Sequence, residues 1–193
     1  MSGYSLAKEI ITRAFPQERL VPQPEREWCG DFSLPVEVAC YYAELGPNNV
    51  TIDAYGNPFF LPSLASLWDF QVGYRFHPKT MERFEGWSAD WFVVGYQGGD
   101  PFIFSRSSSR ILYALHGRGA WDANELFRSL EAMVTTFAII GDVVVGAGDD
   151  LTDEESYLKG RYVKKVEERV VDALGSKGEA EIVLNSLSWV SRS

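Results

Sequence analysis

The segment Val143–Gly148 (VVVGAG) has the residue types of a strand that enters a dinucleotide-binding loop. In such a loop, two glycines let the backbone turn and approach a pyrophosphate, and a third allows a helix to pack closely on a strand. The third glycine would fall at position 151, which holds Leu151. We therefore interpret the segment as a small-residue linker after a helix, and we expect no cofactor.

A serine-rich run, Ser105–Ser109 (SRSSS), supplies hydroxyl groups that could act as nucleophiles. A nucleophile needs a general base within hydrogen-bonding reach, and His116 lies beyond the neighbouring predicted strand. A polar hairpin turn explains the serines better. The sequence also lacks GxxxxGK[ST], HExxH and GxSxG motifs. We expect no catalytic residues and no enzyme, with a hydrolase that uses acidic side chains as the last of three alternatives.

Residues that bind metals are present but scattered. Cys29, Cys40, His77 and His116 include no CxxC pair, so a zinc site is not expected. The acidic residues at 149–155 lack the alternating ligands and the central glycine of a calcium loop, and they suit the first turn of a helix. We expect no metal, and we expect both cysteines to be buried thiols in a reducing compartment.

The composition is that of a folded acidic protein. Of 193 residues, 46% are hydrophobic, which is ample for a packed core. The net charge of −9 repels phosphate backbones, so no nucleic-acid partner is expected, whereas a basic protein would be attracted. Acidity can also serve solubility alone. With no signal-peptide pattern and no run of eighteen apolar residues, we expect a cytoplasmic protein without a membrane segment.

Apolar spacing predicts a first helix at residues 6–15, ended by Pro16, and a second at 34–46. The proline-rich segment 22–31 between them predicts a loop. Further strands are predicted along the chain at residues 50–52, 58–61, 68–74, 91–96, 101–105 and 111–115. Tight turns join the last three, which favours an antiparallel meander. The fold class is therefore α+β: a mainly antiparallel sheet of five or six strands packed with helices, plus a C-terminal helical extension.

A long helix is predicted after these strands. Asp122 with Glu125 suits a capping box, the residues from Leu126 to Phe137 supply an apolar face, and Gly141 is expected to end the helix. The acidic segment 151–155 is expected to start another helix. Residues 157–174 predict an amphipathic helix stopped by Gly175, and residues 179–190 predict one more helical element.

Aromatic residues gather around the predicted hairpin at 91–105, and most are expected to lie in the core. Tryptophan and tyrosine are also over-represented in binding hot spots. Two polar loops flank the hairpin, and loops on a rigid sheet are where recognition usually lies. We therefore predict that the partner-binding residues are Trp87, Asp90, Gln97, Gly98, Gly99 and Asp100.

The order of motifs between residues 34 and 140 is distinctive. It comprises a Leu34-Pro35 helix, a short hairpin, Trp87-x-x-Asp90-Trp91, a strand ending Val94-Gly95, the turn Gly98-Gly99-Asp100, two further strands and a helix with Phe127 and Leu130. This order resembles the SUKH superfamily, which includes the yeast cell-wall assembly regulator and many bacterial immunity proteins. The chain departs from it in a long N-terminal segment and in helices after Gly148. We expect an N-terminal helix and proline-rich lead-in at 1–30, a SUKH-like domain at 31–148, and a helical extension at 149–193 on or near that domain.

The resemblance implies a binding domain with no catalytic residues. Bacterial members are implied to be immunity proteins that block toxins, often nucleases, and yeast-like members to be signalling scaffolds. We expect an immunity protein that neutralises a basic, nuclease-type toxin, with a regulatory scaffold as the alternative. A monomer or weak dimer is expected, in which the tail helix docks on the sheet or pairs with a second copy.

Overall fold

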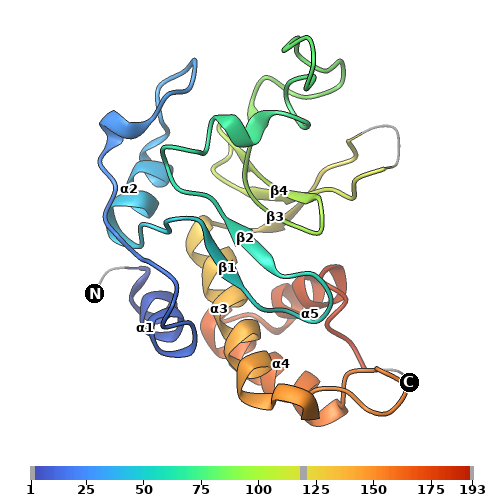
Figure 1. Cartoon of the computed structure of the whole chain (residues 1–193). Coiled ribbons are helices and arrows are strands. Elements are labelled where there is room, and N and C mark those ends of the chain that lie inside the picture. The colour runs from blue at the N-terminus through green and yellow to red at the C-terminus, as the bar shows by residue number, and fades with distance from the viewer. Residues whose placement is uncertain (1–2, 118–120, 192–193) are drawn as a thin grey trace.

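The protein has an α+β fold in a computed structural model that describes residues 3–117 and 121–191 (Figure 1). Six strands form one antiparallel sheet whose spatial order is the order of the sequence. The strands are β1 (Val50–Ile52), β2 (Phe59–Leu61), β3 (Trp91–Gln97), β4 (Asp100–Ser105), β5 (Ile111–Tyr113) and β6 (Asn124–Phe127). The higher of the two expected strand counts is therefore correct.

The helices mostly follow the predicted apolar periodicities. They are α1 (Ser5–Ala14), α2 (Val36–Glu44), α3 (Leu130–Ala147), α4 (Gly160–Leu174) and α5 (Lys177–Ser186). In Figure 1, α3 lies against one face of the sheet with α1 and α4 on either side of it. Because α4 also packs on α5, and α5 on β6, the tail docks on the rest of the protein. Gly175 ends α4 in the left-handed conformation, as predicted.

Alternate residues of the central strands face opposite sides of the sheet, as the period of two in a strand requires. Phe92 lies opposite Phe104, and both belong to the main core with α3. Val93 lies opposite Ile103, and both belong to a smaller cluster on the other face. Irregular segments rather than helices cover that second face, and they include the loop from residue 72 to residue 90.

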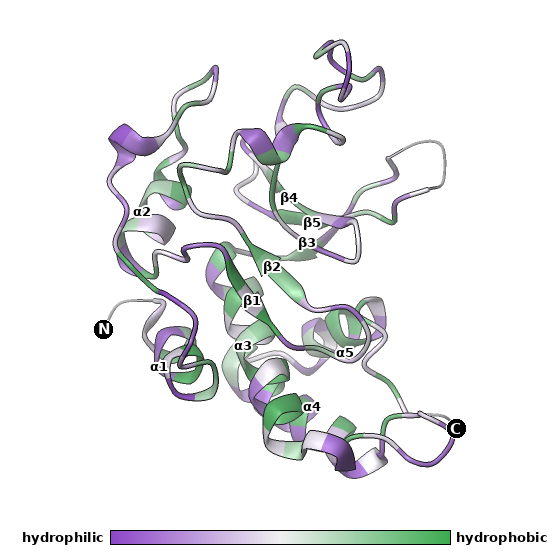
Figure 2. Cartoon of the chain, viewed as in Figure 1, coloured by the Kyte–Doolittle hydropathy of each residue, from purple (hydrophilic) through white to green (hydrophobic). Residues whose placement is uncertain are grey.

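Helix α3 is the centre of the main core. Its Phe137 ring stacks on Phe59 of β2 with centroids 4.0 Å apart, and Figure 2 shows the helix as mainly hydrophobic. The stretch Leu130–Asp150 is long and apolar enough to cross a membrane, although polar residues interrupt it. Since 72% of its most apolar window is buried inside the protein, a core helix accounts for the same composition.

The prediction of a helix from Asp122 is wrong. Residues 124–127 form β6, in which Phe127 pairs with Ile111 of β5. The helix begins later, and its N-cap is Ser129, whose hydroxyl accepts a hydrogen bond from the Ala132 N–H at 3.1 Å. Pairing with β5, rather than the capping-box pattern at Asp122, therefore decides the conformation of residues 124–127, and the local sequence does not predict that pairing.

The prediction that Gly141 ends this helix is also wrong. Helix α3 continues to Ala147, so the 143–148 segment is mostly helical and is neither a linker nor a strand. Gly141 is small because of packing: a Cβ atom there would lie 2.4 Å from Ile52 Cγ2 and 2.7 Å from Phe15 Cζ. The glycine allows α1, β1 and α3 to approach one another closely.

Two further elements differ from expectation. Residues 68–74 form no strand but contain a 3-10 turn, Asp69–Gln71. The acidic segment 151–155 starts no helix, since α4 begins only at Gly160. Asp150 instead pairs with Lys159 at 2.7 Å and with Arg161. Asp150 therefore meets cations at the start of α4, whereas Asp153 Oδ1 accepts hydrogen bonds from the backbone N–H groups of Glu155 and Tyr157.

The expectation of buried thiols is wrong for both cysteines. Cys29 and Cys40 are free and exposed. Cys29 lies in the loop before α2, and Cys40 lies on α2 next to buried Tyr41. Cysteine is usually found in the protein interior, but this preference did not predict the position of Cys40, because the exposed face of α2 on which it lies decides its burial.

Candidate partner-binding site

The six predicted site residues lie at the two ends of β3. Trp87 and Asp90 belong to the loop 86–90 before the strand, which we name the tryptophan loop. Residues 97–100, which we name the glycine turn, close the β3–β4 hairpin at the far end. The length of β3 separates the two groups by roughly 20 Å at the usual rise per residue of a strand. The structure therefore does not bring all six residues into one cluster.

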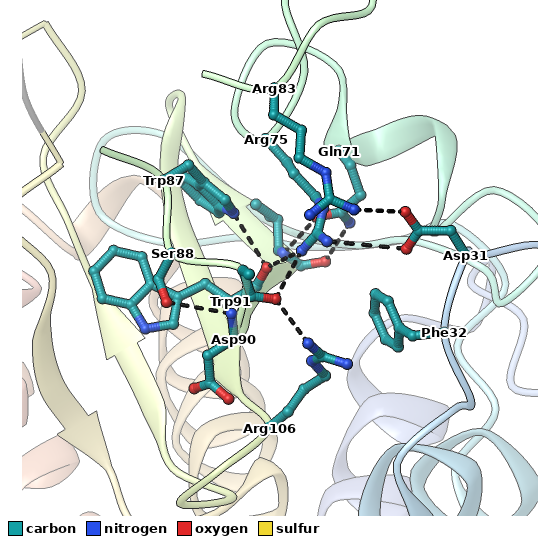
Figure 3. A network of polar contacts seen from close by, with 12 residues as sticks. Asp31, Phe32, Gln71, Arg75, Arg83, Trp87, Ser88, Asp90, Trp91 and Arg106 are labelled. Carbon is teal, nitrogen blue, oxygen red and sulfur yellow. Dashed lines mark hydrogen bonds and ion pairs between the residues drawn. The ribbon is translucent and has the colours of Figure 1, made fainter. Parts of the chain in front are cut away.

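The tryptophan loop is fixed by a buried arginine (Figure 3). Arg75 has a side chain that is only 2% exposed, and its Nη1 donates to the carbonyl oxygens of Ala89 at 3.2 Å and Trp91 at 2.9 Å. Trp87 Nε1 donates to the same Trp91 oxygen at 3.1 Å. Trp87 is 8% exposed, so it holds the loop in place and offers little of its ring to a partner.

A second arginine and an aromatic ring support this loop from the side. Arg106 Nη2 donates to the Ala89 carbonyl at 2.8 Å, and its guanidinium lies 4.3 Å from the centroid of the Phe32 ring. Arg83 pairs with Asp31 at 2.8 Å. Burial, and then the positive charge of Arg83, lower the pKa of Arg75, while Asp31 acts in the opposite direction. These contacts serve positioning, because their acceptors are backbone carbonyls or the partly exposed Asp31.

Asp90 is held by the serine-rich turn. Its Oδ2 accepts hydrogen bonds from Ser105 Oγ at 2.6 Å and from Ser107 Oγ at 3.0 Å. The run 105–109 thus lies in and beside the turn between β4 and β5, as expected from its composition. Its hydroxyls orient a carboxylate, and Asp90 remains half-buried at the edge of the loop.

The glycine turn is rigid and polar. Gly98 and Gly99 both take positive φ, at 58° and 98°, as two-residue hairpin turns require. Asp100 Oδ1 accepts from the His116 backbone N–H at 2.7 Å and lies 2.6 Å from His116 Nδ1. Tyr74 OH donates to the Gly99 carbonyl at 3.0 Å. The turn is therefore tied to two other segments of the chain.

A tyrosine completes this arrangement. Tyr113 OH donates to Asp100 Oδ2 at 3.2 Å. Burial, and then the charge of Asp100, raise the pKa of Tyr113 well above its ordinary value. Burial likewise raises the pKa of Tyr74 to about 12. Both hydroxyls therefore keep their protons at neutral pH and act as hydrogen-bond donors.

His116, Tyr113 and a neighbouring cavity were not predicted as parts of the site. The register that pairs Phe102 with Tyr113 places residue 100 close to residue 115, so the hairpin pattern did carry a signal for the Asp100–His116 contact. The cavity has a volume of about 230 Å³, and Tyr113 forms part of its wall. No strand pattern indicates it, because it forms between β5, β6 and the end of α5.

The described residues show neither a nucleophile hydrogen-bonded to the His116 ring nor a cluster of metal ligands. No described hydroxyl or thiol group is hydrogen-bonded to the His116 ring, which has a side chain 58% exposed. Within residues 3–117 and 121–191, no group of three or more His, Cys, Asp or Glu side chains is placed to hold a metal ion. The described groups offer exposed hydrogen-bonding atoms, carboxylates and a small cavity.

Comparison with known proteins gave no relative. No family model, no curated protein and no solved structure matched this chain. Its function is therefore inferred from the geometry and charge of its own residues.

Proposed function

We propose that this chain is a SUKH-like, non-catalytic protein-binding domain of the immunity type, and that it neutralises a basic toxin. The observation that carries the proposal is the glycine-turn end of the sheet, which we define as residues 97–100, 113–116 and 122–126. There a hairpin turn with two positive-φ glycines and the His116–Asp100 pair lie beside a cavity whose lining includes exposed Asp122 and exposed Glu125. A fixed surface of this kind binds with little loss of conformational freedom.

The charge of the protein supports a basic partner. With a net charge of −9, the chain attracts positively charged proteins over several ångströms and speeds their encounter. A nuclease toxin presents basic residues where it contacts nucleic acid. An acidic surface with built-in hydrogen-bonding groups is suited to cover such a site.

The architecture is consistent with the proposed family. The resemblance between residues 34 and 140 implies a mainly antiparallel sheet of about five or six strands with helices packed against it, and the six-stranded sheet with α3 packed on it agrees with that. The additional helices α1, α4 and α5 pack on this unit rather than replace part of it. The family proposal rests on motif order and architecture together.

Two other functions remain as alternatives. A regulatory scaffold would use the same surface for a host protein, and the neighbouring genes discriminate: a toxin gene beside this one favours immunity. A hydrolase is favoured by one observation, the 2.6 Å contact that orients His116 against Asp100. For a hydrolase, His116→Gln would abolish turnover, whereas an immunity protein would have no turnover to lose.

The direct test is co-expression with any toxin domain that is encoded beside the gene. We expect growth to be rescued by the full chain, and rescue to be weakened by Glu125→Lys at the glycine-turn end. Glu9→Lys, at an exposed position of α1, changes the net charge equally and should leave rescue intact. Failure of the full chain to rescue growth or to bind the toxin would contradict the immunity proposal.

A further inference from the structure

The cavity beside β6 has a mixed lining. Ala114, Leu115 and Leu126 provide apolar walls, while Asp122, Asn124 and Glu125 provide polar ones. Its volume of about 230 Å³ lies below the roughly 300–1,000 Å³ of sites that enclose whole drug-sized ligands. A cavity of this size suits a single long side chain better than a complete small molecule.

The charged residues in the described lining of this cavity are acidic, and the nearby Arg110 forms an ion pair with one of them. Its described lining includes two carboxylates, Asp122 and Glu125, and no lysine or arginine. Arg110 Nη1 approaches Glu125 Oε1 only to 3.8 Å, and these side chains are 42% and 57% exposed. An exposed ion pair of this kind contributes little to stability, so another cation can readily take the place of Arg110 beside Glu125.

The surrounding elements continue the proposed binding surface. Tyr113 forms one wall of the cavity and donates its hydroxyl to Asp100 of the glycine turn. On the other side the cavity borders β6, which is an edge strand of the sheet. A partner bound to the glycine turn could therefore contact this cavity at the same time, because the two are adjacent on the protein surface.

We propose that the cavity receives an arginine side chain of the protein partner. The guanidinium would bind Asp122 and Glu125, whose carboxylates match its fixed fork of N–H donors. The methylene groups would pack on Leu115 and Leu126, as long basic side chains commonly do on apolar surface. This inference rests on the proposed function and names the chemical group that the surface recognises.

The first experiment uses a small probe and the full chain. N-acetyl-arginine amide is titrated into the isotope-labelled protein, and amide chemical shifts are followed by NMR. We expect saturable shifts at Ala114, Leu115, Asn124 and Leu126. The neutral isostere N-acetyl-citrulline amide should bind at least about fivefold more weakly, because it lacks the charge. Equal binding of both probes, or shifts confined to another surface, would overturn the assignment.

Variants connect the probe to the cavity. Asp122→Asn with Glu125→Gln should reduce arginine-probe affinity at least about fivefold. Glu9→Gln with Glu18→Gln removes the same charge near α1 and should change it less than twofold. The spectra of both double variants report directly whether the fold is kept. Equal loss of affinity in the two would show a general charge effect and refute the site.

The toxin test separates this inference from the proposed function. Neutralisation of the toxin by the full chain, with weaker binding by the Asp122→Asn, Glu125→Gln variant, supports both. Undiminished binding by that variant would leave the immunity function in place and refute the arginine cavity. Arginine-probe binding without any toxin binding would keep the cavity and refute the function.

Discussion

Arg75 Nη1 lies 2.9 Å from the carbonyl oxygen of Trp91, the first residue of β3. The contact joins a buried cation to the start of the strand that leads to the glycine turn. Three aromatic rings, those of Phe32, Trp68 and Phe76, lie within 5.6–5.7 Å of the same guanidinium. Arg75 therefore holds the tryptophan loop and the start of the β3–β4 hairpin in a fixed position relative to each other.

Replacing this arginine should destabilise the protein. Arg75→Met removes one charged donor from each of the Ala89 and Trp91 carbonyls, which keep their hydrogen bonds from Arg106 and Trp87. We expect a loss of about 3 kcal/mol in the free energy of unfolding. Urea denaturation measures it. Arg83→Met, at a side chain 53% exposed, is the control and should cost less than about 1 kcal/mol. Similar losses in the two variants would refute the anchoring role of Arg75.

Gln71 should be equally sensitive. It is fully buried, and its amide accepts from the Val93 N–H at 2.9 Å and donates to the Val93 carbonyl at 3.0 Å. The side chain thus bonds to β3 as a neighbouring strand would. Gln71→Met should cost about 2–3 kcal/mol in urea denaturation, whereas Gln17→Met at an exposed position should be nearly neutral. A neutral Gln71→Met would contradict this role.

We predict that Asp142 makes a contribution to stability that is lost in acid. Burial acts to raise its pKa, but hydrogen bonds from Arg169 at 2.7 Å and Arg13 at 3.0 Å outweigh this and lower it below 3.8. A lowered folded-state pKa stabilises the fold above the ordinary aspartate pKa, and that stability is lost as the pH falls.

The test compares the wild type with Asp142→Asn. The variant should be less stable by about 1–2 kcal/mol at pH 7, and the difference should shrink as the pH falls below about 4. Denaturation at several pH values measures the gap. A gap that stays constant from pH 7 to pH 3, a range that includes the ordinary aspartate pKa of about 3.9, would exclude the ion pairs of Arg13 and Arg169 as its source.

The exposure of the two thiols gives a simple chemical test. Cys29 and Cys40 are both free and exposed, so both should react with a thiol reagent such as DTNB in the folded protein. Single Cys→Ser variants assign the reacting residue. A residue that reacts only after denaturation would be buried in solution, contrary to its position in the structure.

Local patterns in the sequence predicted the sheet well. The turns at 97–100 and 107–110 and the alternation in β3 and β4 specify an antiparallel meander, because a strand has a period of two and hairpins need glycine or polar turn residues. The same reasoning located four of the six predicted site residues together on the glycine turn. The helix of residues 5–14 followed from its apolar spacing.

What the sequence did not reveal depends on contacts distant in the chain. Strand β6 exists because it pairs with β5, and position 141 holds a glycine within α3 because Phe15 and Ile52 leave no room there for a Cβ atom. The burial of Arg75 and the cavity beside β6 likewise arise only when separate segments meet. Local sequence propensity does not predict contacts between segments that are distant in the chain.

The central claim is that the glycine-turn end of the sheet grips a basic protein. Hydrogen exchange of the full chain, alone and with an inactive form of the toxin domain encoded beside its gene, tests it most directly. Protection by the toxin should concentrate in residues 97–100, 113–116 and 122–126 and leave α1 unchanged. Protection confined to α1, α4 or the acidic turn at 149–155, or none at all, would contradict the claim.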